Sequence, residues 1–118
     1  MKNMRALMEE LFEAPARLTI VQSEAASMTF IDADGHARTY STSGKKEPHQ
    51  LKSGTVDVRT SWDGTSLRQE ITTGNVKLIE TYSVDSARRQ LTVVLKNDDG
   101  RRGEMPPVRR VYDAADER

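Results

Sequence analysis

Turn-forming dipeptides interrupt this sequence at short intervals, and their spacing constrains the fold more than any other feature. After residue 16 the interruptions are DADGH, STSGKK, WDGT, TTGN, VDSA and NDDG. Asp-Gly and Gly-Asn adopt the positive φ of tight hairpin turns at little steric cost. Between these turns apolar and polar residues alternate, as is typical of half-buried strands. Because no helical segment long enough for a crossover separates two strands, the pattern predicts an antiparallel meander.

The predicted meander contains eight strands. They span Leu18–Gln22, Met28–Asp32, Ala37–Ser41, Thr55–Trp62, Leu67–Thr73, Val76–Val84, Leu91–Lys96 and Val108–Tyr112. The polar stretch SGKKEPHQLKSG, residues 43–54, is predicted to be a long surface loop. Closing a sheet on itself removes its exposed edges, so we expect a mainly β protein whose strands form a small up-and-down barrel. A curled open sheet or a sandwich is the alternative.

Helical periodicity occurs once, at the start of the chain. An apolar stripe is formed by Met4, Leu7, Met8, Leu11 and Phe12. Asn3 is placed to cap this helix and Pro15 marks its end. The length of 118 residues suits a single domain. We therefore predict one amphipathic helix within residues 1–15 that packs on or plugs the barrel, a β-meander over 16–113 and a tail over 114–118.

Composition excludes several classes of partner and chemistry. Lys plus Arg and Asp plus Glu both count 18, so no net charge attracts the chain to nucleic acid. The absence of cysteine excludes disulfides and thiolate catalysis, and fits either side of a bacterial inner membrane. No run reaches the roughly 18 apolar residues of a membrane span. We expect a soluble protein, cytoplasmic as the sequence stands, and periplasmic or secreted if a signal peptide has been removed.

Alternation within the strands assigns side chains to the interior. The set predicted to face inward is Val56, Val58, Thr60, Trp62, Leu67, Gln69, Ile71, Val76, Leu78, Glu80, Tyr82, Val84, Leu91, Val93, Leu95, Val108, Arg110 and Tyr112. Two of these residues, Glu80 and Arg110, carry charge. A lone buried guanidinium is costly, so one interpretation pairs Arg110 with Glu80 or with a tyrosine hydroxyl. The other is that Arg110 and Tyr112 donate to the acidic head group of a bound ligand whose tail lies in an apolar sleeve.

Several segments together resemble the lipocalin and fatty-acid-binding (calycin) barrels, and most closely uncharacterised bacterial lipocalin-like domains. These segments are the WDGTSL hairpin, the strand-turn-strand YSVDSARRQLTVVL and the terminal RRVYD. The Arg-x-Tyr at Arg110 and Tyr112 is similar to the carboxylate clamp on the last strand of fatty-acid-binding proteins. The resemblance implies a non-enzymatic protein that binds a small hydrophobic or amphiphilic ligand. The ligand-binding residues expected on this basis are Arg110, Tyr112, Trp62, Tyr82 and Glu80.

The chain also departs from these families. The stretch RLTIVQ lacks the Gly-x-Trp of lipocalins, and SEAAS is too short for the lid helices of fatty-acid-binding proteins. A barrel filled by its own side chains is therefore the alternative, and it would serve as a structural or protein-interaction domain without a ligand.

Catalytic and metal-binding motifs are absent from the sequence, so we expect no enzymatic activity, no cofactor and no metal. The two histidines, His36 and His49, are both predicted to be solvated surface residues. DADG resembles part of a calcium loop, but the first and twelfth ligand positions would fall on Phe30 and Ser41, where an EF-hand needs carboxylates.

Overall fold

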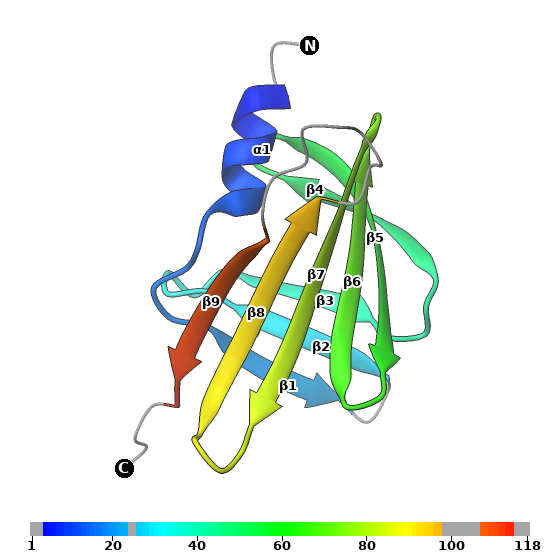
Figure 1. Ribbon diagram of the computed structural model, residues 1–118. Coiled ribbons are helices and arrows are strands. Elements are labelled where there is room, and N and C mark those ends of the chain that lie inside the picture. Colours follow the sequence, from blue (N-terminus) through cyan, green and yellow to red (C-terminus); the bar gives the residue numbers. More distant parts are fainter. Residues whose placement is uncertain (1–3, 24–25, 98–106, 115–118) are drawn as a thin grey trace.

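The computed structural model describes residues 4–23, 26–97 and 107–114, which form one helix and nine strands (Figure 1). Asn3, the predicted helix cap, and residues 115–118 of the predicted tail lie outside this part. The helix is α1 (Met4–Phe12), and the strands are β1 (Thr19–Ser23), β2 (Ser27–Ile31), β3 (Ala37–Ser41), β4 (Lys46–Leu51), β5 (Gly54–Asp63), β6 (Ser66–Thr73), β7 (Val76–Asp85), β8 (Gln90–Asn97) and β9 (Val108–Asp113).

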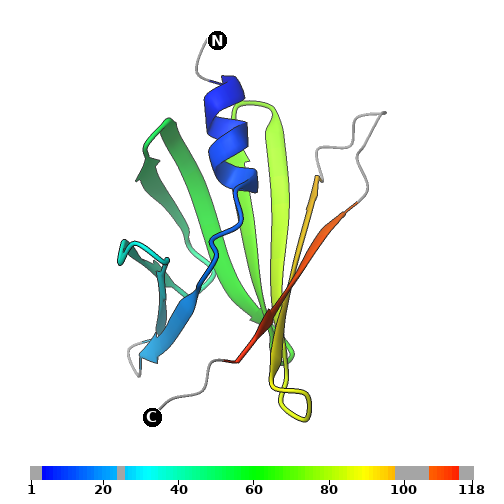
Figure 2. The same ribbon diagram turned by 90° about the vertical axis from the view of Figure 1, so that its left-hand side faces the viewer.

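The strands form two antiparallel sheets that follow the order of the chain. The first contains β1, β2 and β3, and the second contains β4 to β9. The predicted mainly β, antiparallel meander is therefore confirmed. A closed barrel is not confirmed, because the described strands hydrogen-bond as two sheets and not as one ring. Figure 2 shows the two sheets facing each other, with α1 above the opening between them.

The turns behave as their sequences predict. Gly35 and Gly64, in DADGH and WDGT, have φ of 85° and 64°. Glycine reaches this left-handed region without the steric penalty that a Cβ would add. A further positive φ, 87° at Gly44, occurs where the chain passes from the first sheet to the second. There the Gly44 N–H donates to the Thr60 carbonyl at 3.0 Å, which ties the connection to β5.

The prediction of a loop over residues 43–54 is wrong, because β4 lies within it. Glu47, His49 and Leu51 are partly buried while the residues between them are exposed, so the segment has the alternation of a strand. Pro48 and the nearby charges hid this pattern in the sequence. A proline fits here because β4 is an edge strand, in which a missing backbone N–H need not break the ladder.

The side chains predicted to face inward do so over most of the second sheet. The buried residues that share its inner face are Val56, Val58, Thr60, Leu67, Gln69, Ile71, Leu78, Val93 and Leu95. In β9, Val108, Arg110 and Tyr112 are partly buried, whereas Arg109 and Val111 are exposed. Helix α1 packs on this face, with Leu7 only 5% exposed.

Two side chains predicted to face a buried interior are exposed. Trp62 is 44% exposed and Val84 is 73% exposed. Each is the second-last residue of its strand, β5 and β7. Alternation gives the face on which a side chain lies, but coverage of that face depends on a different segment of the chain.

Candidate functional site: the cavity between the two sheets

A cavity of about 910 Å³ lies between the two sheets. Its wall includes residues from α1, β2, β3, β4, β6, β7, β8 and β9, and from the segment that joins α1 to β1. The volume falls within the range of small-molecule sites, roughly 300–1,000 Å³. Apolar side chains, including Phe30, Ile71 and Val93, form part of the wall. The cavity opens to solvent, since exposed residues such as Asp34 and Lys52 also border it.

Three residues form a polar cluster in the cavity wall: Glu80, Tyr82 and Arg110. The Tyr82 hydroxyl donates to Glu80 Oε1 at 3.0 Å. Arg110 Nη1 lies 3.8 Å from Glu80 Oε2, and the two side chains are only 13% and 14% exposed. The strand pairings explain this proximity, because Tyr82 pairs with Val93, which in turn pairs with Arg110. The sequence interpretation that paired Arg110 with Glu80 is confirmed.

Burial controls the ionisation of this cluster. It raises the pKa of the Glu80 carboxyl, although the Tyr82 hydroxyl and the Arg110 charge act in the opposite direction. Burial also raises the pKa of Tyr82, to which the neighbouring Glu80 charge adds. Tyr40, on the opposite sheet, has its pKa raised to about 12 for the same main reason. Burial therefore favours the neutral form of the Glu80 carboxyl and of the tyrosine hydroxyls in this part of the wall.

Residues 13–18, which are called the strap here, run from the lower end of α1 to the start of β1 (Figure 2). Arg110 Nη2 donates to the Phe12 carbonyl, just before the strap, and the Tyr112 hydroxyl donates to the Pro15 carbonyl at 3.0 Å. Both side chains of the Arg-x-Tyr pair thus hold the backbone next to or within the strap. They tie β9 to the end of α1 and to the strap, while β9 and β1 themselves are not paired.

Different contacts link the sheets on the other side of the cavity. Arg38 Nη1 donates to the Gln50 carbonyl at 2.9 Å, which joins β3 to β4. The ring centroids of Tyr40 and His49 lie 4.5 Å apart. At the end of the cavity near α1, the Glu10 carboxylate accepts from the backbone N–H of Ser53 at 2.9 Å. Side chains therefore join the edges that strand pairing leaves apart.

Four of the five predicted ligand-binding residues meet in this cavity. Glu80, Tyr82, Arg110 and Tyr112 all contribute to its wall. Trp62 does not; it borders a separate, smaller hollow of about 390 Å³ beside Met28. The four residues come together because they share the inner face of two strands, β7 and β9, which alternation alone could indicate.

Other residues of the wall were not predicted as site residues. Tyr40 and Arg38 contribute from β3, and Phe30 from β2. The Phe30 ring centroid lies 4.9 Å from that of Tyr82, so the aromatic contact crosses between the sheets. Alternation in ARTYS could have placed Arg38 and Tyr40 on one face. It could not show which strands of the second sheet they would meet.

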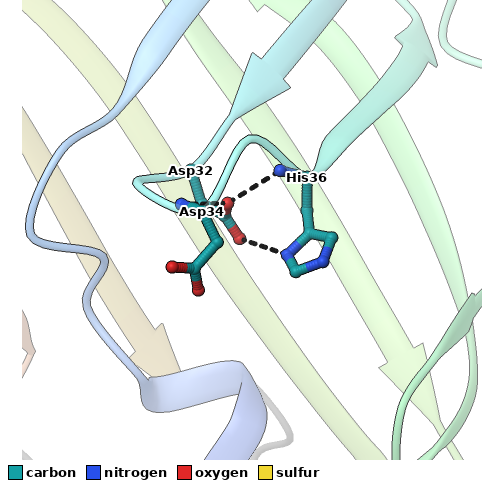
Figure 3. Close-up of side chains that lie close together, drawn as sticks. All are labelled: Asp32, Asp34 and His36. Atoms are coloured by element: carbon teal, nitrogen blue, oxygen red, sulfur yellow. Dashed lines mark hydrogen bonds and ion pairs between the residues drawn. The ribbon is translucent and has the colours of Figure 1, made fainter.

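Asp32, Asp34 and His36 form the one group among the described residues whose side chains could jointly hold a metal ion (Figure 3). One potential ligand atom from each lies within 4.8 Å of the others. Asp32 Oδ1, however, accepts from the backbone N–H of Asp34 at 3.0 Å and of His36 at 2.9 Å. These bonds, with the His36 backbone first, lower the pKa of Asp32. The carboxylate thus serves the β2–β3 turn, as is common for Asp at this position.

The two histidines differ in environment. The His36 side chain is 70% exposed, as predicted. The His49 side chain is only 13% exposed, so its assignment to a solvated surface is wrong. Its Nε2 lies 3.4 Å from Glu47 Oε1, and its ring lies against Tyr40. The cause is again β4, whose alternation turns His49 toward the interior.

Comparison with known proteins returned no match: no family model, no curated protein and no solved structure is similar to the chain at a significant level. Within the described residues, no helix has the length and apolar character needed to cross a membrane.

Proposed function

We propose that this protein is a non-enzymatic, lipocalin-like binding protein that holds a small amphiphilic molecule in the cavity between its sheets. The observation that carries the proposal is the combination of an open cavity of about 910 Å³ with a polar cluster in an otherwise partly apolar wall. Ligand sites typically combine apolar walls with a few convergent polar groups and residues of shifted pKa.

The polar cluster suits the head group of such a molecule. Arg110 supplies donors and a positive charge, Glu80 supplies acceptors, and the Tyr82 hydroxyl can do either. Phe30, Ile71 and Val93 give an apolar surface for the remainder of the ligand. Transfer of that apolar part out of water would contribute roughly 25 cal/mol per Å² of buried surface.

An uncharged fluorescent probe, N-phenyl-1-naphthylamine, tests the proposal because its emission rises on entering an apolar site. We expect saturable binding to the wild-type protein. The Ala14→Trp variant, which places an indole on the strap where Ala14 borders the cavity, should bind the probe weakly. Val111→Trp is the matched control, since Val111 is 51% exposed on the outer side of β9. Equal binding by the two variants, or no saturable binding at all, would refute the proposal.

A structural or protein-interaction domain without a ligand is the second candidate. It is favoured by one observation: both members of the Arg-x-Tyr pair donate to backbone carbonyls near or within the strap. Under this hypothesis Tyr112→Phe lowers the melting temperature, and the wild-type protein shows no saturable probe binding.

A further inference from the structure

The loose geometry of the Arg110–Glu80 pair bears on the kind of head group that fits the cavity. The separation of 3.8 Å between Arg110 Nη1 and Glu80 Oε2 is longer than a direct hydrogen bond, which rarely exceeds about 3.2 Å. The two atoms form an ion pair without a direct hydrogen bond between them, so both side chains keep hydrogen-bonding capacity for a head group beside them. A hydroxyl is such a group, because it can accept from the guanidinium and donate to the carboxylate at the same time.

Charged head groups are less well suited to the same place. An anionic head group would put a second negative charge beside Glu80, with one guanidinium to balance both charges in a site of low exposure. A cationic head group would in turn lie beside Arg110. The existing pair is already neutral, so an uncharged head group leaves the charge balance of the buried site unchanged.

We infer that the cavity selects amphiphiles with an uncharged hydroxyl head group; this inference rests on the proposed function. The cavity accepts anionic amphiphiles only when Glu80 carries a proton. The ligand class is that of long-chain alcohols and related neutral amphiphiles. Protonation of Glu80 removes its negative charge and leaves the Arg110 charge for an anionic head group.

The other ionisable groups that face Glu80 support the assignment of the pH dependence to Glu80 alone. They are Tyr82 on the same strand, Arg110 and Tyr112 on β9 and Tyr40 on β3. Burial is the largest cause that raises the pKa of all three tyrosines, so they stay neutral where Glu80 titrates. Burial raises the pKa of Glu80 itself above its ordinary value of 4.5. Further ionisable groups, which Glu80→Gln leaves in place, line the cavity elsewhere: Glu10, Glu13, Asp32, Asp34, His36, Arg38 and Lys52.

The test compares decanol with decanesulfonate as competitors for bound N-phenyl-1-naphthylamine, at about pH 8 and at about pH 4.5, the ordinary pKa above which that of Glu80 is raised. Decanesulfonate keeps its charge at both values, so any change in its affinity reports on the protein. For the wild-type protein we expect decanol to bind equally at both values. At the higher pH, decanesulfonate should bind at least about tenfold more weakly than decanol. At the lower pH, decanesulfonate should gain affinity.

Glu80→Gln should abolish this discrimination, because the amide retains the acceptor for Tyr82 but carries no charge. Decanesulfonate should then bind equally at both values. Glu9→Gln is the matched control: Glu9 is exposed on α1, does not line the cavity, and the variant should behave as wild type. A thermal melt of each variant confirms that it is folded, and the wild-type pH series alone tests the inference if Glu80→Gln does not fold.

The outcomes separate the two claims. If the probe itself does not bind, the proposed function is wrong and the inference falls with it. Suppose that the probe binds but that, at the higher pH, decanesulfonate displaces it from the wild-type protein as well as decanol does. Only the inference is then overturned. The inference is also overturned if Glu80→Gln leaves the wild-type pH dependence unchanged.

Discussion

The Arg110–Glu80 pair should show measurable energetic coupling in the unfolding equilibrium. Arg110→Met removes the cation beside Glu80 and the donor to the Phe12 carbonyl. Breaking a buried ion pair by removing one partner typically costs about 3–5 kcal/mol. Because Glu80 keeps its bond from Tyr82 and can take up a proton, we expect a loss at the lower end, about 3 kcal/mol near neutral pH.

The same substitution should cost less in the background of Glu80→Gln. The amide of Gln does not need a cation, so the remaining loss is the bond to the Phe12 carbonyl, about 1.5 kcal/mol for a hydrogen bond from a charged donor. The difference between about 3 and about 1.5 kcal/mol gives a coupling energy of about 1.5 kcal/mol.

Urea unfolding of the wild-type protein, both single variants and the double variant near neutral pH measures this coupling by circular dichroism. Free-energy changes that add within about 0.5 kcal/mol would refute the argument, because residues that do not interact behave in this way. Repeating the cycle in mild acid provides the control. The coupling should decrease as the pH falls toward 4.5, because the raised pKa of Glu80 favours uptake of its proton there.

Three further predictions concern stability. Leu78→Ala should cost about 2–5 kcal/mol in urea unfolding because Leu78 is 0% exposed, and Val111→Ala, at a position 51% exposed, should change it by less than about 0.5 kcal/mol. Tyr112→Phe should cost about 0.5–1.5 kcal/mol through loss of the bond to the Pro15 carbonyl; an unchanged melting curve would show that this bond does not stabilise the strap. The pKa of Glu80 is higher in the folded state than its ordinary value of 4.5, so the folded state binds this proton more tightly than the unfolded state. The free energy of unfolding should therefore fall as the pH rises from 4.5 through the folded-state pKa. Glu80→Gln should remove this decline from the pH profile, and a parallel decline in both proteins would assign it to other groups.

Local chemistry in the sequence determined most of the strands, their antiparallel order and the faces of their side chains. Alternation and turn residues act over a few positions, so the sequence pattern alone was enough to place Glu80, Arg110 and Tyr112 on the inner face. The amphipathic helix was equally visible, because its stripe requires only that some apolar surface be available for packing.

The tertiary structure decided what could not follow from local pattern. It divides the strands into two sheets, turns part of a polar segment into β4, and leaves Trp62 44% exposed. It also gives Arg110 and Tyr112 backbone partners that lie 98 and 97 residues away along the chain. Period and turn chemistry specify the face on which a side chain lies. The contacts that the side chain makes depend on how distant segments of the chain pack against that face. This packing is set only when the whole chain folds.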